Sequence, residues 1–294
     1  MNSNIYKNKK PVFFFLLPAF IFMTVFLYYP FFQNIINSFQ SIKGLGSAAK
    51  GWNDPWYENY VKMFTDPKMI TAIKNTAIMV VCTLVFQVGL ALLLAILVDN
   101  IRFGNKFFRT VYFLPIVISA TALGLLFNLI FLYDKGMINQ ILELFGKEKL
   151  TDWKDTAHAL VTMIIPVVWQ YVGFYFVILI TGLNGISDEY YEAARVDGAT
   201  GLQRVRYITL PLLRNVINTC IVLSVTGALK VFDMPWVMFP KGMSGTWLTG
   251  TYMYYQAFNA SNVDYSSAIA VFIVALGVVL SVVVNKICKD VDYC

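Results

Sequence analysis

Long apolar runs dominate the sequence, and shorter polar stretches separate them. Six runs have about the 20 residues that an α-helix needs to cross the hydrocarbon core of a bilayer. They lie near residues 11–32, 72–98, 108–132, 157–183, 212–233 and 267–287. The pattern predicts an all-α membrane protein with six transmembrane helices. The fifth helix has the weakest signal, because Lys230 and Asp233 interrupt its end.

The first run follows three lysines within the first ten residues, a basic start that a secretory signal peptide also has. The apolar core of a signal peptide has only about 7–15 residues, and small residues follow it. This run is longer and ends in aromatic residues, so we expect a retained first span. The predicted organisation is an N-terminal tail at 1–10, a transmembrane domain at 11–287 and a C-terminal tail at 288–294.

Composition agrees with a membrane protein. Hydrophobic residues make up 58% of the chain and charged residues 14%, whereas a soluble domain carries about a quarter charged residues. The net charge of +6 does not indicate nucleic-acid binding, because the basic residues are scattered between apolar runs. The four cysteines show no metal-ligand spacing, and no disulfide framework is expected. His158 lacks a neighbouring Cys or acidic cluster, so we expect it at a membrane interface rather than as a catalytic base.

Local patterns add three expectations about packing. Ala91 and Ala95 are four residues apart, a spacing of small residues that lets membrane helices approach closely. Residues 138–146 have apolar positions at helical spacing, which predicts a short helix with one apolar face. Pro115 and Pro166 lie within or near two spans and free backbone carbonyls there, so a kink is expected.

Basic residues near the ends of the spans predict the orientation through the positive-inside rule. They gather in the N-terminal tail, in the second connection (Arg102, Lys106 and Arg109), in the polar stretch 184–213 and in the C-terminal tail. The remaining connections are longer, and their lysines are mixed with acidic residues. We therefore expect both termini and the stretch 184–213 in the cytoplasm.

The stretch 184–213 is a charged island between two apolar runs. Glu192 and the two alanines after it are good helix formers, and Ser187 or Asp188 can cap a helix here. Gly198 suits a turn in the left-handed conformation, which carries no side-chain penalty for glycine. A second short helical stretch ends at Pro211. The island is predicted to be a helix–turn–helix on the face of the membrane.

Three blocks in this island are similar to a known family. Glu-Ala-Ala at 192–194, Asp-Gly-Ala at 197–199 and Ile-Thr-Leu-Pro at 208–211 resemble the EAA loop of ABC importer permeases. Glu-Ala-Ala alone would be weak evidence, since an amphipathic surface loop can contain it by chance. The resemblance implies a coupling helix in a groove of a cytosolic ATPase. The implied coupling residues are Glu192, Ala193, Ala194, Arg195, Asp197, Gly198, Ala199, Leu210 and Pro211.

The last third of the chain resembles the carbohydrate branch of that family. The matching segments are Val-Phe-Asp at 231–233, Tyr-Tyr-Gln-Ala-Phe at 254–258 and Asp-Tyr-Ser-Ser-Ala at 264–268. The likeness extends over about 11–287, and the N-terminal arrangement is more like the larger of the two maltose-transporter permeases. Pro240-Lys241-Gly242 replaces the Gly-Gly-Pro turn of the branch. That departure leaves the conformation of the loop 234–266 open.

The resemblance implies ATP-driven uptake of a sugar or oligosaccharide through a bacterial cell membrane. The implied partners are a second permease subunit, a cytosolic ATPase dimer, an extracytoplasmic sugar-binding protein, the sugar and membrane lipid. No nucleic acid is expected, and no cofactor of this chain, because the partner would bind ATP. The implied substrate path uses Trp169, Gln170, Tyr171 and Phe174 in one span, and Ser224, Gly227, Ala228 and Val231 in the next.

Other interpretations remain open for some of these residues. Trp169 and Phe174 could instead pack between helices or face lipid. Lys230 and Asp233 could form an ion pair on one helix. A permease of the same family could carry another polar solute such as glycerol phosphate, and the sequence does not name the sugar.

Two other classes of membrane protein, an intramembrane enzyme and a passive channel, agree less well with the sequence. An intramembrane enzyme needs a nucleophile with a base, a metal cluster or paired carboxylates at membrane depth. The sequence has neither HExxH nor GxSxG and no acidic pair within a span. A passive channel needs no coupling helix, and no span has a polar stripe of the kind that forms a selectivity ring. The sequence also lacks GxxxxGK[ST], so ATP hydrolysis is expected from another chain.

Overall fold

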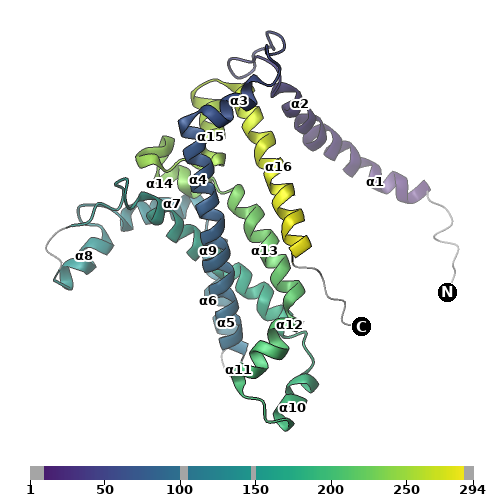
Figure 1. Ribbon diagram of the computed structural model, residues 1–294, viewed down its shortest axis with the longest axis vertical. Coiled ribbons are helices and arrows are strands. Elements are labelled where there is room, and N and C mark those ends of the chain that lie inside the picture. The colour runs from purple at the N-terminus through teal and green to yellow at the C-terminus, as the bar shows by residue number, and fades with distance from the viewer. Residues whose placement is uncertain (1–9, 100–104, 147–149, 288–294) are drawn as a thin grey trace. The chain divides into compact units, whose positions relative to one another are not determined.

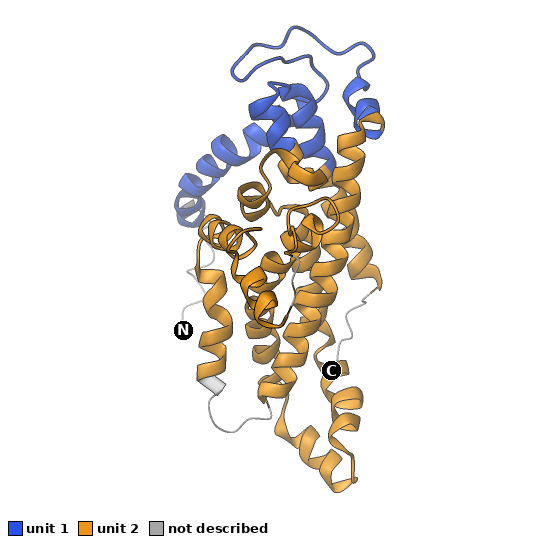
Figure 2. Cartoon of the chain, turned by 90° about the vertical axis from the view of Figure 1, so that its left-hand side faces the viewer, with its two compact units in different colours: residues 1–64, 253–272 blue, residues 65–252, 273–294 orange. Residues whose placement is uncertain are grey.

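The computed structural model describes residues 10–99, 105–146 and 150–287. Figure 2 shows two compact units: residues 1–64 with 253–272, and residues 65–252 with 273–294. The described residues form helices and two isolated β-bridges, with no extended strand. The prediction of an all-α membrane fold is confirmed. The predicted tails at 1–10 and 288–294 lie outside the described residues, apart from Lys10.

The first unit begins with the predicted first span. The helices α1 (Lys10–Met23) and α2 (Tyr29–Asn37) continue through a π-helical turn at Thr24–Tyr28, and Pro11–Asn37 is long enough to cross a membrane. No side chain in its most apolar 18-residue window is buried within the chain. The unit also contains α3 (Glu58–Thr65) except for its last residue, and the first part of α16 (Val263–Ile287).

Polar contacts hold the connection after α2 in this first unit. The side-chain amide of Asn59 donates to the Ser38 carbonyl at 3.1 Å, and the hydroxyls of Ser38 and Tyr60 are 2.8 Å apart. Asp264 on α16 is buried, and its carboxylate lies 3.8 Å from the Lys43 ammonium. These contacts join residues 38–60 to the start of α16.

The second unit contains the long spans. The helices α4 (Pro67–Cys82) and α5 (Gly89–Asp99) are joined by a π-helical turn at Thr83–Val88 and form one span. The longest single helix of the unit is α9 (Ala159–Leu183), which packs against α5. Ala91 and Ala95 are fully buried in this contact, within a cluster that includes Leu179. The predicted small-residue packing face is confirmed.

The third predicted span, 108–132, is not a straight helix. The helices α6 (Asn105–Val117) and α7 (Ala120–Ile130) are bent by 92°, because Ser119 has an extended backbone. The Gln170 side-chain amide of α9 donates to the Ile118 carbonyl at the bend, at 3.3 Å. The described residues therefore hold five helices able to span a membrane, or six if the bent pair counts as one span. The predicted short helix at 138–146 is confirmed as α8 (Met137–Leu144).

The fifth predicted span is also broken. The helix α13 (Arg214–Leu229) ends before Lys230, and α14 (Asp233–Met238) begins three residues later. Lys230 and Asp233 therefore do not share a helix face, and the salt bridges found among the described residues do not include this pair. The expected ion pair is wrong, because the helix does not continue through the two residues.

The loop that lacks the Gly-Gly-Pro turn forms tight turns before α15 (Thr249–Tyr254). Lys241, Gly242 and Ser244 have left-handed backbone conformations between Pro240 and Gly245. A Cβ at Gly242 would lie 2.1 Å from the Trp247 ring. Close approach of the backbone to this indole therefore requires glycine at 242.

Candidate functional site

The island 184–213 has the predicted helix–turn–helix form. The helix α10 (Asp188–Val196) is followed by α11 (Gly201–Arg204), a π-helical turn at Val205–Thr209 and α12 (Leu210–Leu212). Figure 1 shows α10 and α11 at the end of the second unit opposite to α14. The island thus lies at the end of α9 and the beginning of α13.

Backbone hydrogen bonds fix the turn between α10 and α11. Gly198 has φ +74°, and its N–H donates to the Arg195 carbonyl at 3.1 Å. The Ala199 N–H donates to the Ala194 carbonyl at 2.9 Å, which completes a Schellman motif. Thr200 and Gln203 then form a reciprocal capping box at the start of α11. Because these terminal groups are paired, the turn has a defined conformation.

The predicted coupling residues differ in exposure. Glu192, Ala193, Arg195, Asp197 and Gly198 are exposed, Ala194 is buried within the chain, and Ala199, Leu210 and Pro211 are half-buried. Large apolar side chains on the island are exposed as well. They are Tyr190 at 55%, Val196 at 89%, Leu202 at 80% and Tyr207 at 70% exposure.

A polar hollow of ≈ 610 Å³ lies beside these helices. Asp99 of α5 and Asp188, Arg195 and Arg204 of the island line it, among other residues. The island therefore combines exposed apolar side chains, charged groups and a concave surface. Protein-interaction sites often have this combination.

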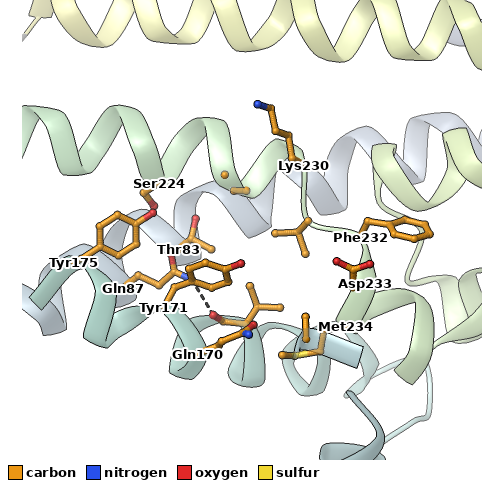
Figure 3. Close-up of a pocket in the computed structure, with 15 residues that line it drawn as sticks. Thr83, Gln87, Gln170, Tyr171, Tyr175, Ser224, Lys230, Phe232, Asp233 and Met234 are labelled. Atoms are coloured by element: carbon orange, nitrogen blue, oxygen red, sulfur yellow. Dashed lines mark hydrogen bonds between the residues drawn. The ribbon is translucent and has the colours of Figure 1, made fainter. Parts of the chain in front are cut away.

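A second cavity, of ≈ 220 Å³, lies among the spans. Figure 3 shows its lining from the π-helical turn 83–88, from α9 and from α13 with the link to α14. Six of the eight residues predicted for the substrate path line it: Gln170, Tyr171, Ser224, Gly227, Ala228 and Val231. The buried members present amide and hydroxyl groups. Such groups can hydrogen-bond a polar molecule at membrane depth.

The two other predicted path residues do not line this cavity. Trp169 is 45% exposed, lines an apolar groove on another side of α9 and contacts the Phe127 ring edge-to-face. Phe174 packs against the Tyr175 ring, with centroids 5.3 Å apart. Their placement matches the packing or lipid-facing interpretation that the sequence left open.

Sequence reasoning missed the contribution of the second span to the cavity. Thr83 and Gln87 are buried and line it, and the Gln87 amide donates to the Val167 carbonyl at 2.9 Å (Figure 3). A signal was available, because Thr83 and Gln87 are four residues apart within an apolar run. That spacing puts two polar groups on one helix face, where hydrocarbon would penalise them.

His158 makes a local contact outside the spans. Its backbone N–H donates to the Asp155 carboxylate at 2.8 Å, and its ring Nδ1 lies 2.7 Å from the same oxygen. These hydrogen bonds, the backbone one first, lower the pKa of Asp155. Among the residues described, no group of three or more His, Cys, Asp or Glu side chains could hold a metal ion. The free cysteines in the described ranges are Cys82 and Cys220.

Comparisons with known proteins agree with this architecture. A probable ABC transporter permease protein, YurN of Bacillus subtilis, is 34% identical over 96% of this chain and 97% of its own length. The lactose transport system permease protein LacF of Rhizobium radiobacter is 30% identical over 91% and 90%. The fold is also that of a chain in a bacterial ABC transporter involved in the import of the acidic polysaccharide alginate. That similarity has a TM-score of 0.85 at 23% identity and covers 99% and 100% of the two chains.

Residues 87–289 match the family described as the binding-protein-dependent transport system inner membrane component. The match includes the island and all of the cavity lining except Thr83, so the family predicted from the EAA blocks is confirmed. The chain belongs to this family, as a multi-pass inner-membrane permease of the ABC transporter type.

Proposed function

We propose that this chain is one of two permease subunits of an ATP-driven importer of a sugar or oligosaccharide. In the proposed complex a cytosolic ATPase dimer binds the island, and an extracytoplasmic binding protein delivers the sugar. Both termini and the island lie in the cytoplasm, as the distribution of basic residues predicts. ATP is bound and hydrolysed by the partner, and this chain needs no cofactor of its own.

The exposed apolar surface of the island is the main observation that supports binding of an ATPase there. Leu202 and Val196 are at least 80% exposed on a segment that also carries several exposed charged side chains. Removing such side chains from water is favourable by about 25 cal/mol per Å² of apolar surface. A partner surface that covers them would supply this gain. Glu192, Arg195 and Arg204 are placed near them to make polar contacts at the rim of the same interface.

A single pair of variants tests docking. Leu202→Asp puts a charge into the proposed apolar contact and should reduce co-purification of the ATPase at least tenfold. Leu144→Asp is the matched control, because Leu144 is 87% exposed on α8, away from the island. It should leave co-purification unchanged. Equal ATPase recovery with both variants would contradict docking through the island.

The cavity supports a sugar as substrate. Amide and hydroxyl groups of Gln87, Gln170 and Ser224 can hydrogen-bond sugar hydroxyls, and the rings of Tyr171 and Tyr175 can pack on the apolar C–H face of a pyranose. The volume of ≈ 220 Å³ is below the about 300–1,000 Å³ of a complete small-molecule site. A path completed by a second permease subunit would account for the difference. Lactose is carried by one relative, which supports the same class of solute.

Gly227 provides the test of the path. A Cβ at Gly227 would meet no heavy atom within 4 Å, so the first atom of a side chain fits there, and the ring of a phenylalanine should occupy space in the cavity that Gly227 lines. Gly227→Phe should abolish ATP-driven sugar uptake at normal membrane abundance. Gly89→Phe is the control, since Gly89 is also free of contacts but does not line the cavity. Full uptake by Gly227→Phe would contradict this path.

A further inference from the structure

Asp233 brings to the cavity a carboxylate whose hydrogen-bonding capacity is unused, whereas the two glutamines of the lining are already paired. The side-chain amides of Gln87 and Gln170 each donate to a backbone carbonyl, at 2.9 and 3.3 Å. Among the residues that the structure describes, the exposed Asp233 carboxylate has neither a hydrogen bond nor an ion pair. Figure 3 shows this carboxylate directed into the cavity.

The break between α13 and α14 puts Asp233 in this position. Phe232 leaves the helical conformation, with φ −140° and ψ −59°, and its ring stacks on Trp236 at 5.7 Å. The next residue, Met234, is 2% exposed. Asp233 therefore lies between two anchored neighbours, and its carboxylate stays at the cavity wall.

Lys230 does not neutralise this carboxylate. In Figure 3 its side chain extends away from Asp233, toward α16. There it lines a separate hollow together with Ile273 and Val274. The cavity wall consequently carries a negative charge that the described part of the chain leaves uncompensated.

An ionised carboxylate within a candidate span is unfavourable unless water or a ligand supplies donors. Two neighbouring hydroxyls of a saccharide can donate to its two oxygens, and hydrogen bonds to a charged group are about twice as strong as neutral ones. A saccharide with its own carboxylate would instead be repelled. We infer that Asp233 binds substrate hydroxyls in the translocation path and selects neutral saccharides over acidic ones. This inference rests on the proposed transport of saccharides.

The test measures uptake into proteoliposomes that contain the full importer, with labelled neutral disaccharides and the corresponding uronates. Asp233→Asn keeps the shape and removes the charge. It should raise the KM for the neutral sugar about tenfold and lower the ratio of neutral to acidic uptake. Asp134→Asn, the control, makes the same change at an exposed carboxylate that does not line the cavity, and should change neither by more than about twofold. The binding protein is the same in all variants, so its own selectivity cancels.

Thiol labelling gives a second readout that does not depend on transport rate. Asp233→Cys, in a background without the native cysteines, should react with a water-soluble maleimide, and the transported sugar should slow the reaction. Unchanged KM and selectivity in Asp233→Asn, or labelling that the sugar does not affect, would overturn the role of Asp233. The proposed function fails separately, if the wild-type complex takes up no saccharide with ATP.

Discussion

Replacing Gly173 by alanine tests the packing that holds the cavity wall in place. Gly173 lies on α9 between the cavity residues Gln170 and Tyr175, and its buried face meets α6. A Cβ at this position would lie 1.7 Å from the Tyr112 carbonyl oxygen and 2.4 Å from its carbonyl carbon. Both are backbone atoms of α6, so no side chain can rotate to make room.

The size of the effect follows from these distances. Ordinary contact begins at 3.4 Å, so α6 and α9 would have to separate by roughly 1.7 Å. That separation opens the edge-to-face contact of Tyr112 with Phe176, whose centroids are 5.2 Å apart. Overpacking of this kind costs about 1–3 kcal/mol, while the better helix propensity of alanine returns about 1 kcal/mol. Because backbone must move, we expect a net loss of about 2 kcal/mol in the free energy of unfolding.

The assay is the melting temperature of the purified chain in detergent, followed by tryptophan fluorescence. A loss of about 2 kcal/mol lowers the melting temperature of a chain this size by roughly 4–8 °C. Gly89→Ala is the control, because Gly89 is also helical and a Cβ there meets nothing within 4 Å. It should melt at or slightly above the wild-type temperature.

The comparison of the two alanine variants can refute the reasoning. If Gly173→Ala and Gly89→Ala have the same melting temperature, α6 does not approach α9 as closely as described. The position of the bend after α6 would then be wrong too, because Gln170 contacts it from the same face of α9.

Three further changes have defined outcomes. Asn139→Ala removes a buried amide that bonds four backbone groups and an indole, which should lower the free energy of unfolding by about 3 kcal/mol in a denaturant titration. Thr200→Ala removes the capping box, so amide hydrogen exchange in α11 should accelerate about fivefold, and Thr200→Ser should restore it. The lowered pKa of Asp155 means that its contribution is present above its usual value of 3.8 and lost as the pH falls below it. Asp155→Asn should therefore flatten the acid side of the melting-temperature profile, and an unchanged profile would contradict this contribution.

The sequence predicts the spans well, because length and apolarity alone decide whether a segment can cross a bilayer. It does not predict the 92° bend in the third span, because the contact that satisfies the Ile118 carbonyl comes from Gln170, about 50 residues away. For the fifth span, Lys230 and Asp233 indicate an interruption, but the sequence does not show that the helix ends at Leu229. Local apolarity therefore predicts that a segment can span the membrane, but not where its helix bends or ends.

Only part of the cavity lining could be predicted from the sequence, again because local apolarity does not show how a helix is oriented. The helix α9 is apolar on all sides, so periodicity cannot say which face meets the cavity. Gln170 and Tyr171 turned out to line the cavity, whereas Trp169 lines an apolar groove elsewhere on the helix. The island was easier to predict, since helix caps and glycine turns depend on the identity of a few neighbouring residues.

In the proposed complex, motion of the ATPase would reach the spans only through a rigid joint, so the proposed coupling depends on the stiffness of the turn at Gly198. Proline cannot adopt φ +74° and has no N–H for the Arg195 carbonyl, so Gly198→Pro should disrupt the turn. Gly201→Pro is the control, since the first position of α11 accepts proline and the preceding Thr200 is already extended.

The most direct measurement is ATP-driven sugar uptake by proteoliposomes containing each variant together with its ATPase. We predict that Gly198→Pro inserts and still hydrolyses ATP through its partner but takes up no sugar, while Gly201→Pro transports at close to the wild-type rate. Full sugar uptake by Gly198→Pro would contradict the coupling role of the island.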